Sequence, residues 1–257
     1  MKKMVFAALF VFAALFFTMI IGTYVTLSNA ANADSTNTTT LVDDSDMALT
    51  EVIAHLDDWK SESSNYTGDP YLVLVNKEHP LPLNWTNLIV LDKAQNSLGE
   101  EFLVEHEALQ QFYALRDYLL ENEGVDIELD STYRTTDDQK AIWEAWLPTE
   151  GVEYCQKYLA KVGYSEHHTG LAIDIFILRG DEQIRDNDDM LADVQDFGRV
   201  HANLAKFGFI LRYLPGGKEE ITGYGYEAWH LRYVGSPETA AKIMDNRLTL
   251  EEYLASK

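Results

Sequence analysis

Cysteine is almost absent from this sequence, since Cys155 is the only one in 257 residues. A lone cysteine excludes a disulfide within the chain and any metal site that needs two cysteines from one chain. Basic residues are also scarce, because 20 Lys and Arg face 42 Asp and Glu and leave a formal charge of −22. Binding to a phosphate backbone requires clustered positive charge, so we expect no nucleic-acid partner.

Apolar residues, by contrast, are plentiful. Hydrophobic residues make up 46% of the sequence and aromatic residues 12%. This composition supports a sizeable buried core and excludes disorder over the whole length. The length favours one domain over two, and we expect a monomer.

The first residues have the features of an export segment. Lys2 and Lys3 precede an uncharged apolar run from Met4 to Ile21, and Ala31-Asn32-Ala33 has the small-x-small pattern of a cleavage site. Residues 1–33 are therefore expected to be either a signal peptide, cleaved before Asp34, or a retained membrane anchor. Both alternatives place the remainder outside the cytoplasmic membrane, secreted or anchored at the cell envelope.

The rest of the chain divides into a tether and a domain. Residues 34–46 are rich in Ser, Thr, Asn and Asp, which predicts a solvated tether. Residues 47–257 are expected to form one domain. Apolar spacing and capping residues predict its helices at about 49–59, 101–122, 136–146, 152–162, 190–207, 237–246 and 250–255. Strands are predicted at 71–75, 129–133, 171–178, 209–213 and 229–234. The order does not alternate regularly, so we expect an α+β fold with a small, mainly antiparallel sheet flanked by helices.

An aspartate in an apolar strand is the first sign of chemistry. Asp174 lies between Ile173 and Ile175, and a buried lone carboxylate requires a cationic or metal partner. His167 precedes it by seven residues, and Glu227-Ala228-Trp229-His230 lies far downstream. Two imidazoles and one carboxylate form a catalytic zinc shell that leaves a fourth position for water. A glutamate three residues before a ligand suits the general base that such a site uses.

Three blocks of this sequence resemble the VanY-type D-alanyl-D-alanine carboxypeptidases, zinc peptidases of the bacterial cell wall. Ser131-Thr132-Tyr133-Arg134, followed by Gln139, is similar to the first block of that family. The string from Ser165 through His167, Gly170 and Ala172 to Asp174 is similar to the second, and Glu227 to Val234 is similar to the third. The family often has Pro where this chain has Ala228, which changes backbone stiffness and not chemistry.

The resemblance implies a zinc site at the sheet and a role for each matching residue. It implies one zinc ion per chain, held by His167, Asp174 and His230, with Glu227 as catalytic base. Arg134 would hold a substrate carboxylate or the developing oxyanion. The remaining residues that it places at the substrate are Ser131, Tyr133, Gln139 and Ser165. Motif spacing selects His167 over its neighbour His168, because adjacent extended side chains point to opposite sides.

Several functions remain open on the sequence alone. The first is removal of a C-terminal D-alanine from peptidoglycan stem peptides, with D,D- or L,D-specificity. A wall endopeptidase or a D-Ala-D-Ala dipeptidase is the second, and a cell-wall binding module without turnover is the third. Every position expected to carry chemistry is present, which favours an enzyme over the binding module.

Overall fold

A computed structural model describes Val52 and residues 55–257 of this chain. The predictions for residues 1–33 and 34–46, and residues 49–51, 53 and 54 of the helix predicted at 49–59, lie outside the described residues. Among the described residues, no helix has the length and apolarity needed to span a membrane.

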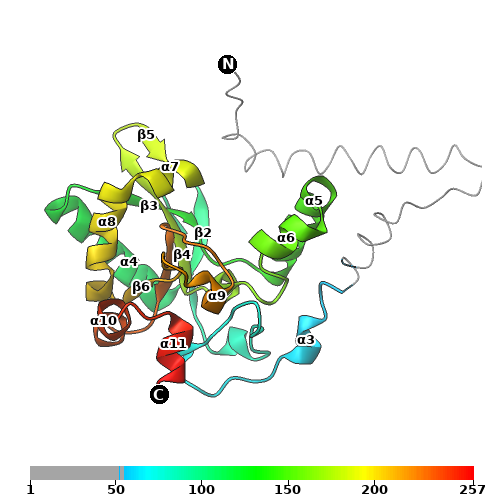
Figure 1. Ribbon diagram of the computed structural model, residues 1–257. Coiled ribbons are helices and arrows are strands. Elements are labelled where there is room, and N and C mark those ends of the chain that lie inside the picture. Colours follow the sequence, from blue (N-terminus) through cyan, green and yellow to red (C-terminus); the bar gives the residue numbers. More distant parts are fainter. Residues whose placement is uncertain (1–51, 53–54) are drawn as a thin grey trace, which may run out of the picture. The chain divides into compact units, whose positions relative to one another are not determined.

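The described chain forms a mixed α and β fold around one antiparallel sheet (Figure 1). The order of the main path is β3-β4-β7-β6, and β5 pairs with β4 outside it. A separate hairpin consists of β1 and β2. The strands are β1 (Leu91–Gln95), β2 (Glu101–Glu105), β3 (Asp126–Ser131), β4 (Ala172–Arg179), β5 (Glu182–Ile184), β6 (Phe209–Leu211) and β7 (His230–Tyr233).

Helices cover the sheet. The longest, α4, packs on β3, and α10 packs on β6. In Figure 1, α4 and α8 gather on one side of the strands, while α5 and α6 form a pair on the other side. The α-helices are α3 (Trp59–Glu62), α4 (His106–Asn122), α5 (Thr136–Glu150), α6 (Val152–Tyr158), α7 (Asn187–Ala192), α8 (Val194–Asn203), α9 (Glu219–Thr222), α10 (Pro237–Asp245) and α11 (Leu250–Ala255). Short 3₁₀ helices are η1 (Pro70–Leu72), η2 (Trp85–Asn87), η3 (Glu166–Thr169) and η4 (Leu204–Phe207).

Strand β4 is the centre of the sheet and carries the predicted aspartate. Because strand side chains alternate between faces, Ile173, Ile175 and Ile177 point away from the face of Asp174. All three isoleucines are buried in the main hydrophobic core. The pairing with β3 and β7 on either side fixes the position of Asp174, and this confirms the predicted α+β, mainly antiparallel fold.

Two predicted elements are wrong in the region before α4. The apolar run 71–75 is not a strand, because it begins inside η1 and continues as unpaired chain whose side chains Val73 and Val75 are buried. The helix predicted at 101–122 begins only at His106. Residues 101–105, the first five of the predicted helix, form β2 instead. This strand pairs with β1, and neither strand was predicted.

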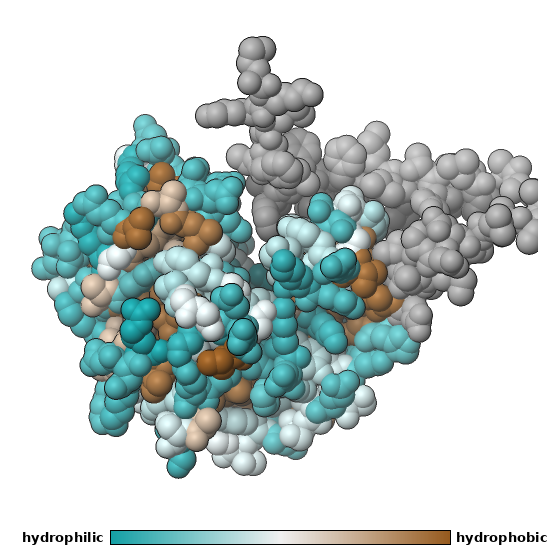
Figure 2. Space-filling view, in the orientation of Figure 1, coloured by the Kyte–Doolittle hydropathy of each residue, from teal (hydrophilic) through white to brown (hydrophobic). Residues whose placement is uncertain are grey.

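Smaller differences concern element ends. The helix predicted at 190–207 is three pieces, and it breaks at Asp193, whose side chain accepts from the Asp196 amide and caps α8. The helix predicted at 136–146 is capped by Thr135, which forms a capping box with Asp138, and it continues past Trp146 to Glu150. The short strand β5 was also missed. Hydrophilic residues dominate the face shown in Figure 2, as the acidic composition leads one to expect.

Candidate metal and catalytic site

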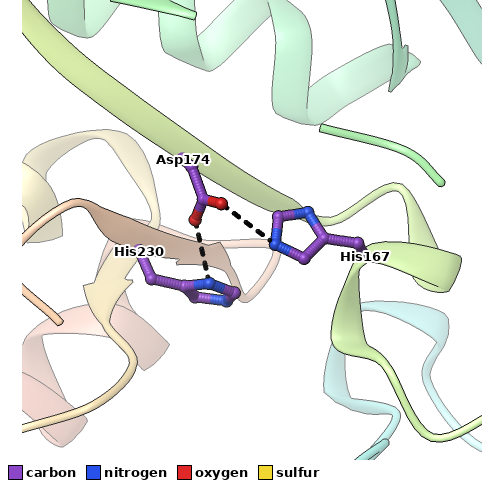
Figure 3. A group of neighbouring side chains, drawn as sticks. All are labelled: His167, Asp174 and His230. Carbon is purple, nitrogen blue, oxygen red and sulfur yellow. Dashed lines mark ion pairs between the residues drawn. The ribbon is translucent and has the colours of Figure 1, made fainter. Parts of the chain in front are cut away.

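Three of the predicted residues meet on one face of the sheet. Asp174 projects from β4, His230 begins β7, and His167 comes from the 3₁₀ turn η3 (Figure 3). One ligand atom from each of the three lies within 4.8 Å of the others. Gly170 makes the turn from η3 into β4 possible with a left-handed φ of 73°, and a Cβ there would approach Leu91 to 2.8 Å.

The Asp174 carboxylate lies between the two imidazoles. Its Oδ2 is 3.2 Å from His167 Nε2, and its Oδ1 is 3.0 Å from His230 Nδ1. Two ligands of one tetrahedral zinc ion are separated by about 3.3 Å when each bond is about 2.0–2.1 Å. These distances therefore match a shared metal ion.

Each histidine uses its outer nitrogen to bind an acceptor. His167 Nδ1 lies 2.7 Å from the carbonyl oxygen of Thr132, which can only accept, so this nitrogen carries a proton. His230 Nε2 lies 3.0 Å from Glu166 Oε2. In the neutral rings, the remaining lone pairs of both histidines face the Asp174 carboxylate, an arrangement that a metal ion bound between the three groups would stabilise.

The electrostatics of the site agree with this arrangement. Asp174 Oδ1 is buried and has no hydrogen-bond partner of good geometry among the described residues. Burial opposes ionisation of Asp174, but His167 and His230 outweigh it and lower its pKa. Burial likewise opposes a charge on His230, but Asp174 and Glu166 raise its pKa to about 10. The site thus favours positive charge between its three groups, and a bound dication supplies it.

Glu227 lies beside the metal-ligand group. Its Oε2 is 3.7 Å from His230 Nδ1, and its side chain is 27% exposed. Desolvation raises the pKa of Glu227 to about 7, and the Asp174 carboxylate adds to the rise while His230 opposes it. A carboxylate with a pKa near neutrality, close to a metal position and open to solvent, is suited to exchange protons.

Arg134 lies at the corner between β3 and α5. Its Nη1 donates to Gln139 Oε1 at 2.7 Å and its Nη2 to Ser131 Oγ at 3.2 Å. Gln139 is fully buried and its amide also donates to the Ala160 carbonyl at 2.8 Å. Ser131 and Gln139 therefore orient the guanidinium, which makes their role indirect.

The other predicted residues occupy the wall of the site. His168 is buried, and its two nitrogens lie 2.7 Å from the Arg134 carbonyl and 3.2 Å from the Gly163 amide, so it faces away from the metal group. Burial lowers the pKa of His168 to about 4 and keeps it neutral. Tyr133 is half-buried, with its amide bound to the Leu103 carbonyl, and Ser165 is buried directly before η3.

Sequence reasoning missed three charged residues that surround His230. Glu166, Arg212 and Arg232 are all almost fully buried and bound to one another. Arg212 and Arg232 stand in the apolar strings Phe209–Leu214 and His230–Val234. Asp174 was predicted to be functional because it is a charge inside an apolar strand. The same pattern surrounds Arg212 and Arg232 and could have indicated them too.

The comparisons with known proteins identify the family. The family model described as VanY, D-alanyl-D-alanine carboxypeptidase, matches residues 101–236. A bifunctional D-Ala-D-Ala dipeptidase and carboxypeptidase, VanXYC of Enterococcus gallinarum, is 37% identical over 188 residues, which are 71% of this chain and 92% of that protein. This chain belongs to the VanY family of carboxypeptidases.

Other relatives agree. The Bacillus subtilis protein YodJ is 37% identical over 71% of this chain and 66% of its own length, so the chain spans slightly less than two thirds of that relative. A solved structure of the LD-carboxypeptidase LdcB superposes with a TM-score of 0.61, at 32% identity, over 75% of this chain and 94% of that one. The solved structure of a VanY from a VanB-type resistance cassette, in complex with Zn(II), superposes with a TM-score of 0.57 at 33% identity. The match covers 72% of this chain and 99% of that one. The predicted family, fold class and enzyme class are confirmed.

Proposed function

We propose that this chain is a zinc-dependent carboxypeptidase that removes a C-terminal D-alanine from peptidoglycan stem peptides. The observation that carries the proposal is the convergence of His167, Asp174 and His230 beside Glu227. The names of the VanY-family relatives support the substrate class.

His167, Asp174 and His230 would hold one zinc ion per chain. Burial lowers the pKa of His167 and keeps its imidazole neutral, as a metal ligand must be. A zinc ion in such a shell lowers the pKa of a coordinated water toward about 7 and polarises a peptide carbonyl.

Glu227 would act as the general base and then as the general acid. In its ionised form it accepts a proton from the attacking water, and it returns that proton to the leaving amine. Its Oε2 lies 3.7 Å from Nδ1 of the proposed ligand His230, so Glu227 borders the place where the attacking water would be activated.

Arg134 would bind the free C-terminal carboxylate of the substrate or the oxyanion that forms at the scissile carbonyl. A guanidinium matches a carboxylate through two parallel hydrogen bonds. Ser131 and Gln139 fix its orientation, which lowers the entropy lost when substrate binds. Tyr133 and Ser165 would line the same pocket.

Mass spectrometry of products from defined stem pentapeptides, tetrapeptides, cross-linked peptides and the D-Ala-D-Ala dipeptide tests the proposal. Release of one D-alanine from the pentapeptide indicates D,D-specificity, and release from the tetrapeptide indicates L,D-specificity. Cleavage of the free dipeptide alone favours a dipeptidase, and cleavage of cross-linked peptides favours an endopeptidase. If the zinc-loaded protein cleaves none of these substrates, the proposal of an enzyme is contradicted and a wall-binding module remains.

The same proposal places the enzyme outside the cytoplasmic membrane. The support is the positive start of the chain, the apolar run from Met4 to Ile21 and the Ala31-Asn32-Ala33 pattern. Fractionation of the producing cells, with N-terminal sequencing of the mature protein, distinguishes a cleaved signal from a retained membrane anchor.

A further inference from the structure

Glu166 is a buried carboxylate that joins the metal site to the surrounding fold. It lies in η3 directly before His167, and it is only 3% exposed. Its Oε2 lies 3.0 Å from His230 Nε2, while its Oε1 accepts from Arg212 at 2.8 Å and from Arg232 at 2.7 Å. The two guanidinium donors on Oε1 favour the charged, accepting form of this carboxylate.

The contact with His230 determines which ring nitrogen can bind a metal. An ionised carboxylate only accepts, so His230 Nε2 must carry a proton and Nδ1 presents its lone pair on the side of Asp174. The Tyr213 ring is tilted by 51° against His230, with the ring centroids 4.8 Å apart, and restrains the imidazole from another side. Glu166 therefore restrains both the tautomer and the orientation of this imidazole.

The contacts of the arginines extend this support away from the site. Arg212 donates through Nη1 and Nη2 to Glu251 on α11, at 3.0 and 2.6 Å. Arg232 donates through Nη2 to the carbonyls of Tyr71 and Val73, at 3.0 and 2.8 Å. The segment 71–73 and the helix α11 are thus connected to His230 through one carboxylate.

We propose that Glu166 is a positioning residue for the metal ligand His230, and that Arg212 and Glu251 extend its support to the C-terminal helix α11. The proposal rests on the zinc site of the proposed function. Loss of a carboxylate that orients a histidine ligand weakens metal binding by about 10–100-fold. A variant that lacks this carboxylate keeps the three metal ligands, so zinc binding is weakened and not abolished.

The test is zinc affinity, measured by competition with a chelator. Glu166→Asp keeps the negative charge for Arg212 and Arg232 but withdraws the carboxylate from His230 by one methylene. We expect its zinc dissociation constant to rise about 10–100-fold. In proton NMR of the zinc-loaded protein, the hydrogen-bonded Nε2–H resonance of His230 should move upfield or broaden. An unchanged dissociation constant with an unchanged resonance would overturn the proposal.

A second pair of variants tests the extension to α11 and remains informative if Glu166→Asp does not fold. Glu251→Gln weakens the link to Arg212, whereas Glu252→Gln makes the same change at the next residue, which binds Lys218 instead. We expect severalfold weaker zinc binding for Glu251→Gln and no change for Glu252→Gln. Equal affinities for these two variants would show that α11 has no part in the support.

The unmutated protein separates this inference from the proposed function. If it binds no zinc, the metal site itself fails and the proposed function fails with it. If it binds zinc tightly and hydrolyses stem peptides while Glu166→Asp binds equally tightly, only the positioning role of Glu166 fails.

Discussion

Asp174 and His230 lie directly opposite one another on the neighbouring antiparallel strands β4 and β7, and their Oδ1 and Nδ1 atoms are 3.0 Å apart. Two of the three proposed metal ligands are therefore placed by sheet register. A slip of one residue would turn one of these side chains to the other face of the sheet. The third ligand, His167, comes from the turn that leads into β4, so the whole group depends on the pairing of one strand.

Metal analysis of alanine variants checks which of the adjacent histidines is the ligand. We expect His167→Ala and His230→Ala to lose most of the bound zinc, because each removes one of three ligands. His168→Ala should retain zinc, since both nitrogens of His168 contact backbone groups of Arg134 and Gly163. Loss of zinc in His168→Ala together with full zinc in His167→Ala would show that the ligand assignment is displaced by one residue.

Glu227→Gln should separate metal binding from turnover. The amide preserves the shape of the side chain but cannot accept the proton of the attacking water. We expect normal zinc content and melting temperature with kcat reduced by roughly 10²–10⁴-fold. Glu220→Gln, at an exposed position of α9, is the matched control and should behave as the unmutated enzyme. Near-normal turnover in Glu227→Gln would remove this residue from the mechanism.

The acid dependence of stability should contain a contribution from Glu251. Burial raises the pKa of this carboxyl, but Arg212 outweighs burial and lowers it below the ordinary value of 4.5. A lowered folded-state pKa means that the pairing stabilises the fold fully above about pH 4.5 and is lost as the pH falls through the folded-state value. The unmutated protein should therefore exceed Glu251→Gln in free energy of unfolding by roughly 1.5–3 kcal/mol at pH 7.

Denaturant unfolding of both proteins between pH 7 and pH 3 measures this difference. The gap should narrow below about pH 4.5, because protonation of Glu251 in the unmutated protein removes the charge that the variant already lacks. A gap that stays constant down to pH 3 would show that the Glu251 charge does not stabilise the fold.

Sequence reasoning singled out His167, Asp174 and His230 through one anomaly and two matching blocks, and the structure brings these three residues together. Asp174 is a charge in an apolar strand, and the spacing of His167 and His230 in known blocks supplied the rest. Glu166 was missed because it stands in a polar string where a glutamate is unremarkable. Its importance follows only from the fold, which brings Arg212, directly after β6, and Arg232 of β7 into contact with it.

The local sequence pattern also failed to predict secondary structure where contacts with distant parts of the chain decide it. Residues 101–105 continue the helical spacing of α4, yet they form β2 because β1 is available as a partner. Residues 71–75 are rich in β-forming side chains, but no strand in the described part of the chain pairs with them. The carbonyls of Tyr71 and Val73 instead accept from the Arg232 guanidinium, a contact from a distant part of the chain.

Arg134→Lys distinguishes a substrate clamp from an ordinary ion pair. Lysine keeps the positive charge but lacks the planar fork that binds a carboxylate through two hydrogen bonds. We expect kcat/KM for free-acid peptides to fall at least about tenfold, with zinc content and melting temperature unchanged. Arg199→Lys is the matched control, because Arg199 is 39% exposed and pairs with Asp196 three residues earlier on its own helix, outside the proposed site.

Peptides amidated at the C-terminus determine which group Arg134 holds. If the guanidinium binds the terminal carboxylate, amidation removes its partner, and the unmutated enzyme should cleave these peptides poorly while Arg134→Lys loses little more on them. If Arg134 instead stabilises the oxyanion, amidated and free peptides should be cleaved alike and the variant should be impaired equally on both. Equal cleavage of both substrates by the unmutated enzyme would show that Arg134 does not hold the terminal carboxylate, and equal impairment of Arg134→Lys on both would assign it to the oxyanion.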